Sequence, residues 1–357
     1  MKKLLVLLSI LLVTVGLTAC SSTPAVEETE EPTGYEIALV TDIGTIDDKS
    51  FNQGAWEGVV QYADENGLTY QYYKPAEATT VAYVAAITEA VDAGAKAVVT
   101  PGYMFAPAVY EAQTMYPDVS FILLDADPHT EDYATFAIEN NVYAVYYAEE
   151  QSGFLAGYAA VKEGYTSLGF MGGMAVPAVV RFGYGFLQGA DLAATELGVQ
   201  VTVNYKYLNS FAQDTAWATE AKSWYSEGTE VIFAAAGGAG LSVMAGAEEV
   251  DGKVIGVDVD QSNLSATVLT SATKGLTSSV YDALTDFYAG SFKGGQIVTL
   301  DAAVGGVGLP ADFSRFTTFT VADYDAVFAK LVDGSIVVNS AIDAQPVLKY
   351  TTVNVIE

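Results

Sequence analysis

The sequence predicts an α/β protein with two similar lobes, each built on a parallel β-sheet. First, short apolar runs alternate with helical stretches from residue 35 onward, which is typical of parallel strands joined by crossover helices. Second, strand-like segments of the first half recur in the second half. Third, 51% of the 357 residues are apolar, and a chain of this length folds as about two domains.

The duplication sets the predicted strands in order. Runs that begin at Tyr35, Gly67, Asp92 and Phe121 match runs that begin at Ser167, Gly198, Ser226 and Val254. All four pairs lie 131 to 134 residues apart, which chance repetition does not explain. Ligands of open parallel sheets bind beyond the carboxyl ends of the strands, so we expect the loops after each run to line a cleft between the lobes.

Two helices are marked most clearly. Ser50-Phe-Asn-Gln53 fits a capping box, in which Ser50 caps the first helix and Gln53 reaches back. We expect the equivalent helix of the second half over residues 178–197. Its predicted buried stripe consists of Phe182, Phe186, Ala190, Ala193 and Leu197.

The N-terminus has the features of an export signal. Two lysines precede an apolar run over residues 4–15, too short for a membrane span, and Leu17-Thr-Ala-Cys20 resembles the bacterial lipobox, in which the cysteine is acylated. We therefore expect a lipoprotein signal peptide over residues 1–19 and a lipid anchor at Cys20. The alternative is a plain secretory signal. Residues 20–34, rich in Ser, Thr, Pro and Glu, predict a flexible acidic tether.

Composition excludes several functions. The 44 acidic and 15 basic side chains give a formal charge of -29, which disfavours nucleic-acid polymers as partners. One Cys and one His cannot form a zinc finger, a His-rich metal site or a disulfide framework. His129 lies in a polar, turn-like stretch and is interpreted as a surface residue. We expect no metal, no cofactor and no catalytic residue, although paired carboxylates leave glycosidic cleavage open.

Polar and aromatic residues gather where the predicted strands end. Asp42, Phe51 and Asn52 lie in or directly after the loop that follows the first strand, which also holds Asp47 and Asp48. Asp125 and Asp258 end equivalent runs in the two halves. Each of these acids could merely cap a helix, but the symmetric placement of one acid per lobe favours ligand contact. The small-residue loop from Ala234 to Gly240 would let backbone N–H groups approach a ligand.

The block from Asp42 to Gly58 resembles the signature of the basic membrane protein family, the purine-nucleoside receptor lipoproteins of ABC importers. The similarity continues through Val176–Phe182, Asn209–Asp214 and Ile255–Gln261. It implies a type I periplasmic-binding-protein fold, in which two Rossmann-like lobes are joined by three crossovers. These crossovers are expected near residues 140–143, 270–276 and 300–304. The N-terminal lobe would then comprise 35–142 and 273–300, and the C-terminal lobe 143–272 and 301–357.

The resemblance also implies roles for single residues. Phe51 and Phe211 match the two aromatic residues that sandwich the base, and Asp125 matches the acid that binds the purine edge. The remaining matches lie around the ribose and its neighbouring contacts: Asp42, Asp258 and Lys274, with Asn52 and Gly237 completing the site.

The implied function is capture without chemistry. A lipid-anchored protein on the outer face of the cytoplasmic membrane, expected to be a monomer, would bind adenosine, guanosine or inosine and deliver it to an ABC permease and its ATPase. Two alternatives stay open. One is a pentose- or hexose-binding protein of the same fold, and the other is a nucleoside hydrolase or glycosidase.

Overall fold

The computed structural model describes residues 34–342 and 350–357. The predicted signal peptide, the predicted anchor Cys20 and all of the predicted tether except Gly34 lie outside the described residues. Within the two described ranges, no helix is long and apolar enough to cross a membrane.

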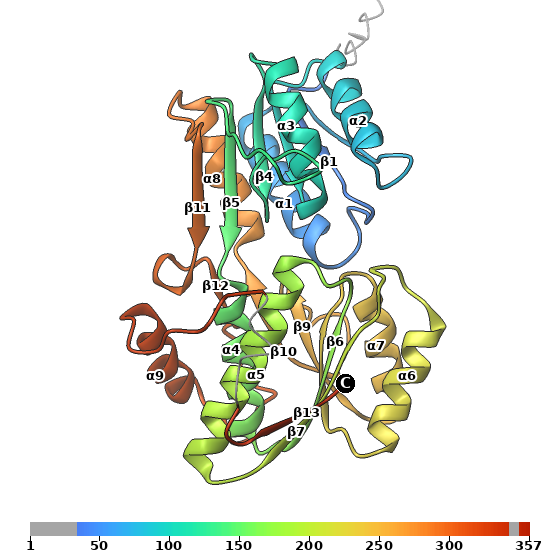
Figure 1. The fold of residues 1–357 in the computed structure, drawn as a ribbon, viewed down its shortest axis with the longest axis vertical. Coiled ribbons are helices and arrows are strands. Elements are labelled where there is room, and N and C mark those ends of the chain that lie inside the picture. Colours follow the sequence, from blue (N-terminus) through green and yellow to red (C-terminus); the bar gives the residue numbers. More distant parts are fainter. Residues whose placement is uncertain (1–33, 343–349) are drawn as a thin grey trace, which may run out of the picture. The chain divides into compact units, whose positions relative to one another are not determined.

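The first sheet has six parallel strands in the order β11-β5-β4-β3-β1-β2 (Figure 1). The strands are β1 (Ile37–Val40), β2 (Tyr70–Tyr73), β3 (Ala97–Pro101), β4 (Ser120–Leu124), β5 (Val142–Tyr147) and β11 (Gln296–Leu300). Its helices are α1 (Phe51–Asn66), α2 (Thr80–Asp92), the short 3-10 helix η1 (Tyr103–Phe105), α3 (Ala106–Met115) and α8 (Leu276–Tyr288). Alternate residues of β1 serve opposite faces: Ile37 and Leu39 belong to the core beneath α1 and α8, and Ala38 and Val40 to the core beneath α2 and α3.

The second sheet has seven strands in the order β12-β10-β9-β8-β6-β7-β13. They are β6 (Ser167–Gly172), β7 (Val201–Tyr207), β8 (Val231–Ala235), β9 (Lys253–Asp258), β10 (Val268–Lys274), β12 (Val307–Gly308) and β13 (Val353–Ile356). Its helices are α4 (Glu149–Glu163), α5 (Pro177–Leu197), α6 (Thr215–Ser226), α7 (Ala239–Glu248) and α9 (Val321–Val332), with the 3-10 helix η2 (Ala302–Val304). The edge strand β12 pairs with β10 in antiparallel fashion, which the prediction of a parallel sheet did not include.

The predicted duplication is confirmed by the strand order. The sequence β4-β3-β1-β2 of the first sheet corresponds to β9-β8-β6-β7 of the second, and these are the four pairs of matched runs. Asp125 follows β4 directly and Asp258 ends β9, so the two acids occupy equivalent places. The two-lobe α/β architecture is as predicted.

The chain passes between the two sheets three times, after β5, after β10 and after β11. All of β5 pairs within the first sheet, beside β4 and β11, so the first crossing follows Tyr147. The expected crossing at 140–143 and the lobe boundary at 142 are therefore too early, because the run from Val142 is the fifth strand of the first sheet. Likewise β10 keeps residues up to Lys274 in the second sheet, two residues beyond the expected boundary.

The predicted capping box of α1 is wrong. Ser50 makes no side-chain cap to the helix, and its hydroxyl donates instead to Asp258 Oδ2 at 2.5 Å. The cap comes from Asp48, whose carboxylate accepts from the backbone N–H groups of Ser50, Asn52 and Gln53 at 2.8 to 3.1 Å. A carboxylate at a helix N-terminus also suits the helix dipole. The Ser50 side chain is thus free to join α1 to the second lobe.

Helices α4 and α5 lie side by side with their backbones in close contact (Figure 1). Gly153 and Gly157 of α4 face carbonyl oxygens of α5, and Gly185 and Gly189 of α5 face carbonyl oxygens of α4. A Cβ atom at any of the four would overlap the opposite backbone. The predicted stripe of α5 is buried except at Leu197, which is 48% exposed because it is the last residue of the helix.

Candidate ligand-binding site

A cavity of about 750 Å³ opens where the strands of both sheets end. Its lining comes mainly from the segments after β1 to β4 in the first lobe, and from the segments after β6 to β8 and the last residues of β9 and β10 in the second. A volume of this size suits a small organic ligand. All eight residues predicted for the site line it: Asp42, Phe51, Asn52, Asp125, Phe211, Gly237, Asp258 and Lys274.

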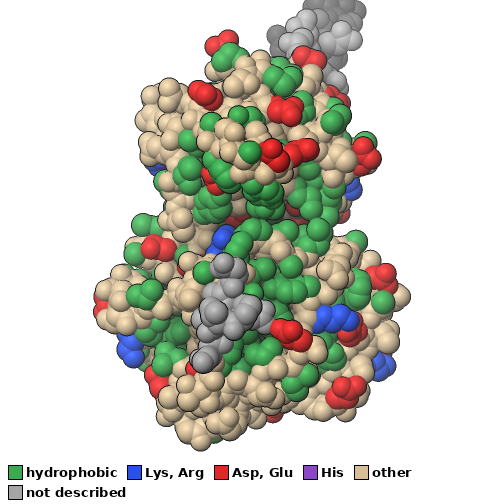
Figure 2. All heavy atoms as spheres, viewed as in Figure 1, with side chains coloured by type: hydrophobic (Ala, Val, Ile, Leu, Met, Phe, Trp, Pro, Cys, Tyr) green, Lys and Arg blue, Asp and Glu red, His purple; other side chains and the backbone are tan. Residues whose placement is uncertain are grey.

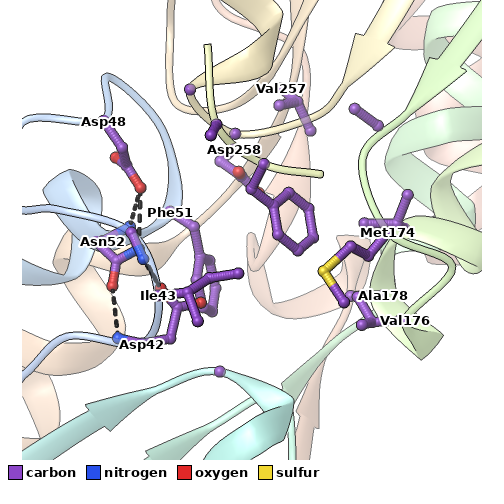
Figure 3. A pocket seen from close by; sticks show the side chains of 18 of the residues that line it. Asp42, Ile43, Asp48, Phe51, Asn52, Met174, Val176, Ala178, Val257 and Asp258 are labelled. Atoms are coloured by element: carbon purple, nitrogen blue, oxygen red, sulfur yellow. Dashed lines mark hydrogen bonds between the residues drawn. The ribbon is translucent and has the colours of Figure 1, made fainter. Parts of the chain in front are cut away.

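The two walls of the cavity differ in character (Figure 3). Asp42, Asp48, Phe51 and Asn52 lie on one side, and Met174 on the opposite side, beside Val176 and Ala178. Figure 2 shows hydrophobic side chains gathered across the middle of the visible face. A ligand with an apolar body and a polar edge would match such a lining.

Asn52 organises the loop after β1. Its amide nitrogen donates to Asp42 Oδ1 and to Asp48 Oδ2, both at 3.0 Å, and its oxygen accepts from the Asp42 backbone N–H at 3.4 Å. The residue is only 3% exposed. The geometry therefore gives Asn52 a supporting task, since the hydrogen-bonding groups of its side chain already have partners in the loop.

Lys274 is the centre of a buried ion cluster. Its ammonium lies 2.6 Å from Asp125 Oδ2, 3.2 Å from Glu149 Oε1 and 3.9 Å from Asp258 Oδ1. Arg181 Nε donates to the other oxygen of Glu149 at 2.5 Å. Burial lowers the pKa of Lys274, but attraction to the three carboxylates outweighs burial and raises this pKa above its usual value, so the ammonium stays charged.

The carboxylates of the cavity differ in their readiness to ionise. Burial raises the pKa of Asp42 to about 6, and it raises the pKa of Asp125 to about 7 although Lys274 acts in the opposite direction. Burial also raises the pKa of Asp258. For Glu149 burial acts upward, but Lys274 and Arg181 together lower its pKa below the usual value. The two cations therefore favour the ionised form of Glu149, whereas the pKa values of Asp42 and Asp125 lie close to neutral pH.

Asp125 also has an unused hydrogen-bonding atom. Its Oδ2 accepts from Lys274, whereas Oδ1 is buried and has no partner among the described residues. A buried carboxylate oxygen without a donor is costly, and a ligand N–H would satisfy it.

Three residues of the lining other than glycine have left-handed backbones. The φ angles are 62° at Asp125, 57° at Asn209 and 67° at Asp258. This region is uncommon for residues other than glycine and is found where the surrounding structure enforces it, often at functional sites. Because Asp125 and Asp258 follow equivalent strands, the strained turn belongs to the duplicated design of the two lobes.

The two predicted aromatic residues lie against charged or small neighbours. The Lys274 ammonium is 4.6 Å from the centre of the Phe51 ring, close enough for a cation–π contact. The Phe211 ring occupies the space that a side chain at position 173 would need, so Gly173 makes room for it. Gly237, with φ of 54°, supplies a left-handed turn beside the same ring.

Sequence reasoning missed Glu149 and Arg181 as parts of the cluster. Arg181 lies in a segment that resembles the family, but no role was inferred for it, and Glu149 follows β5, where the crossing was misplaced. The interpretation of His129 as a surface residue is wrong. This residue is 4% exposed, because Tyr133 stacks on its ring at 4.3 Å and Phe136 packs at 5.1 Å.

Comparison with known proteins now identifies the family. The model of the family described as "ABC transporter substrate-binding protein PnrA-like" matches residues 36–341. The chain belongs to this family. The ABC transporter nucleoside-binding protein BmpA of Lactococcus lactis is 31% identical over 303 residues, covering 78% of this chain and 82% of the relative. Basic membrane protein A of Borreliella burgdorferi is 28% identical and covers 94% and 95% of the two chains.

Solved structures support the fold. A solute-binding protein of an ABC transporter from Aeropyrum pernix superposes with a TM-score of 0.75 at 22% identity, covering 87% of this chain and 95% of that one. The family consists of substrate-binding proteins, so this member is not an enzyme, and such proteins work outside the cytoplasm. Among the described residues no cluster of His, Cys, Asp and Glu could hold a metal ion.

Proposed function

We propose that this substrate-binding protein captures purine nucleosides, namely adenosine, guanosine and inosine, and delivers them to an ABC permease and its ATPase. The observation that carries the proposal is the buried Oδ1 of Asp125, which has no hydrogen-bond partner in the described part of the chain, in a cavity that Phe51 and Phe211 also line. The name of the Lactococcus relative supports the same ligand class. We further propose that Cys20 anchors the protein by lipid to the outer face of the membrane, and that it acts as a monomer.

Phe51 and Phe211 supply affinity, and Asp125 supplies selectivity. Stacking of a base on an aromatic side chain contributes about 1–3 kcal/mol and tolerates any flat ring. A carboxylate that receives ring N–H groups is left without a partner when the wrong edge of a ligand is presented. Guanosine and inosine carry a ring N–H, and adenosine carries an exocyclic amino group, so each can donate to Asp125.

The charges of the lining favour nucleosides over nucleotides. Five carboxylates line the cavity, from Asp42, Asp47, Asp48, Asp125 and Asp258, against the two ammonium groups of Lys74 and Lys274. A phosphate would meet this excess of negative charge, whereas ribose hydroxyls would donate to it. Asp42 and Asp258 are the proposed acceptors for the ribose.

A thermal-shift panel of nucleosides, free bases, nucleotides and sugars tests the proposal. A ligand at about 100 times its dissociation constant adds about 2.7 kcal/mol to the free energy of unfolding. We expect adenosine, guanosine and inosine to raise the melting temperature, and AMP and ribose to leave it unchanged. Stabilisation by AMP equal to that by adenosine would refute the preference for nucleosides. Stabilisation by ribose alone would indicate a sugar-binding protein, and release of hypoxanthine from inosine would reveal a hydrolase.

Inosine affinity is expected to fall as the pH is lowered from 8 to 5. Burial raises the pKa of Asp125 to about 7 in the free protein, and the ionised form accepts the ring N–H more strongly than the protonated form does. Binding therefore lowers this pKa and releases a proton, so affinity is greatest above pH 7 and weakens below it. Calorimetry at each pH, in two buffers of different ionisation enthalpy, measures the affinity and the proton release. An affinity that rises toward pH 5 would contradict this assignment.

A further inference from the structure

Glu149 holds a position that the nucleoside proposal does not use. It is the first residue of α4, directly after the crossing from β5, and it is 0% exposed. Its two oxygens face two cations: Oε2 accepts from Arg181 Nε at 2.5 Å, and Oε1 lies 3.2 Å from Lys274 Nζ. Lys274 in turn ends β10, directly before the second crossing. The pair thus joins two of the three segments that connect the lobes.

The charged groups around Lys274 come from both lobes. Asp125 follows β4 and belongs to the first lobe, whereas Glu149, Arg181 and Asp258 belong with Lys274 to the second. The shortest contact of the ammonium, at 2.6 Å to Asp125, therefore crosses between the lobes. A cleft that admits a ligand needs its lobes to separate. A separation that carries Asp125 away from Lys274 would leave Glu149, at 3.2 Å, as the nearest carboxylate of the ammonium.

The anchoring of Glu149 does not depend on the first lobe. Arg181 lies on α5, and the glycine contacts at positions 153, 157, 185 and 189 fix α5 against α4. Five charged groups of the described residues interact electrostatically with Glu149: Arg181 on α5, Lys274 on β10, Asp125 after β4, Asp258 on β9 and Glu150 beside it on α4.

We propose that Glu149, anchored by Arg181, is a positioning residue that holds the Lys274 ammonium at the floor of the cleft when the lobes separate. Lys274 then meets Asp125 and the ligand in a fixed place when the lobes close. The inference rests on the proposed capture of nucleosides. Preorganisation of this kind removes the cost of ordering a long side chain at the moment of binding.

Inosine binding to Glu149→Gln, Lys274→Met and the double variant tests this role. Gln keeps an acceptor for Arg181 and removes the charge that holds Lys274. We expect Glu149→Gln to weaken inosine binding about tenfold, and the double variant to bind no more weakly than Lys274→Met alone. If Glu149 acts only through Lys274, its substitution has no further effect on inosine affinity in a protein that lacks Lys274. The losses of affinity from two independent residues would multiply.

Glu150→Gln is the matched control. Glu150 is the next residue of α4 and is also buried, but it makes no ion pair with Lys274 within the described residues. Its affinity for inosine is expected to stay within about twofold of the wild type. If Glu149→Gln yields no folded protein, Glu149→Asp replaces it. The shorter carboxylate reaches less far toward Nζ and is expected to weaken binding at least threefold.

Two results would overturn the inference: wild-type affinity in Glu149→Gln or Glu149→Asp, or losses that multiply in the double variant. A wild-type protein that binds no nucleoside would instead refute the proposed function. In that case the same cycle, measured on denaturant unfolding of the ligand-free protein, decides the positioning role. An interaction energy of zero between positions 149 and 274 would then exclude it.

Discussion

Asp125→Asn is expected to weaken nucleoside binding by about 10- to 100-fold while leaving the ligand-free fold intact. The buried Oδ1 of Asp125 has no partner among the described residues, and in the proposed complex it receives an N–H of the base. A hydrogen bond to a charged group contributes about 1.5–3 kcal/mol, and each 1.4 kcal/mol is a factor of ten in affinity. The asparagine amide also presents its own N–H groups to the donor edge of the base.

The ligand-free protein tolerates this change because the cluster holds an excess of negative charge. Three carboxylates, from Asp125, Glu149 and Asp258, surround the cations Lys274 and Arg181. Removing one carboxylate makes the set electrically neutral, and Lys274 keeps Glu149 and Asp258 nearby. We expect the free energy of unfolding to change by less than about 1 kcal/mol, which is small beside the cost of stranding a buried charge.

Calorimetry with inosine and thermal melting of the free protein measure the two quantities. Asp127→Asn is the matched control, since Asp127 lies two residues further along the same loop and bonds the hydroxyl of Tyr146 outside the cavity lining. Its affinity should stay close to that of the wild type. A large loss of stability in Asp125→Asn with unchanged affinity would assign Asp125 to structural support.

The sequence itself best predicted those site residues that recur at equivalent places in the two halves of the chain. Asp125 and Asp258 could be selected because equivalent strands in the two halves end in the same residue type. Phe51, Phe211 and Lys274 needed the family resemblance, since a phenylalanine or a lysine has no local pattern that separates a ligand contact from ordinary packing. The cavity brings all of them together, as expected for residues at the carboxyl ends of parallel strands.

What remained hidden depends on contacts between distant segments. Ser50 has the local sequence of a helix cap, yet Asp258, 208 residues away, takes its hydroxyl and Asp48 caps the helix instead. Glu149 and Arg181 meet only because α4 and α5 approach closely. Strand β5 has no partner in the duplicated pattern, so the boundary between the lobes was placed at its start. Local propensity does not encode any of these pairings.

Gly185→Ala is expected to lower the free energy of unfolding by at least about 3 kcal/mol, the upper part of the range for overpacked cores. A Cβ atom at this position would overlap the backbone oxygen of Glu150. The overlap is hard to relieve, because glycines of both helices hold α4 and α5 in close contact. Alanine normally stabilises a helix interior relative to glycine by about 0.5–1 kcal/mol, so the expected sign is the reverse of the intrinsic preference. Denaturant unfolding of the ligand-free protein measures the change.

Gly240→Ala supplies the control for that experiment. Gly240 lies in helix α7, and an added Cβ atom there would meet its nearest neighbour, the Ala234 oxygen, at an ordinary 3.6 Å. We expect Gly240→Ala to leave the free energy of unfolding unchanged or to raise it by about 0.5–1 kcal/mol, the intrinsic preference of a helix for alanine over glycine. Equal stability of the two variants would show that α4 and α5 can separate.

Since α4 carries Glu149 and α5 carries Arg181, a partly folded Gly185→Ala protein is also expected to bind inosine more weakly, although position 185 does not line the cavity.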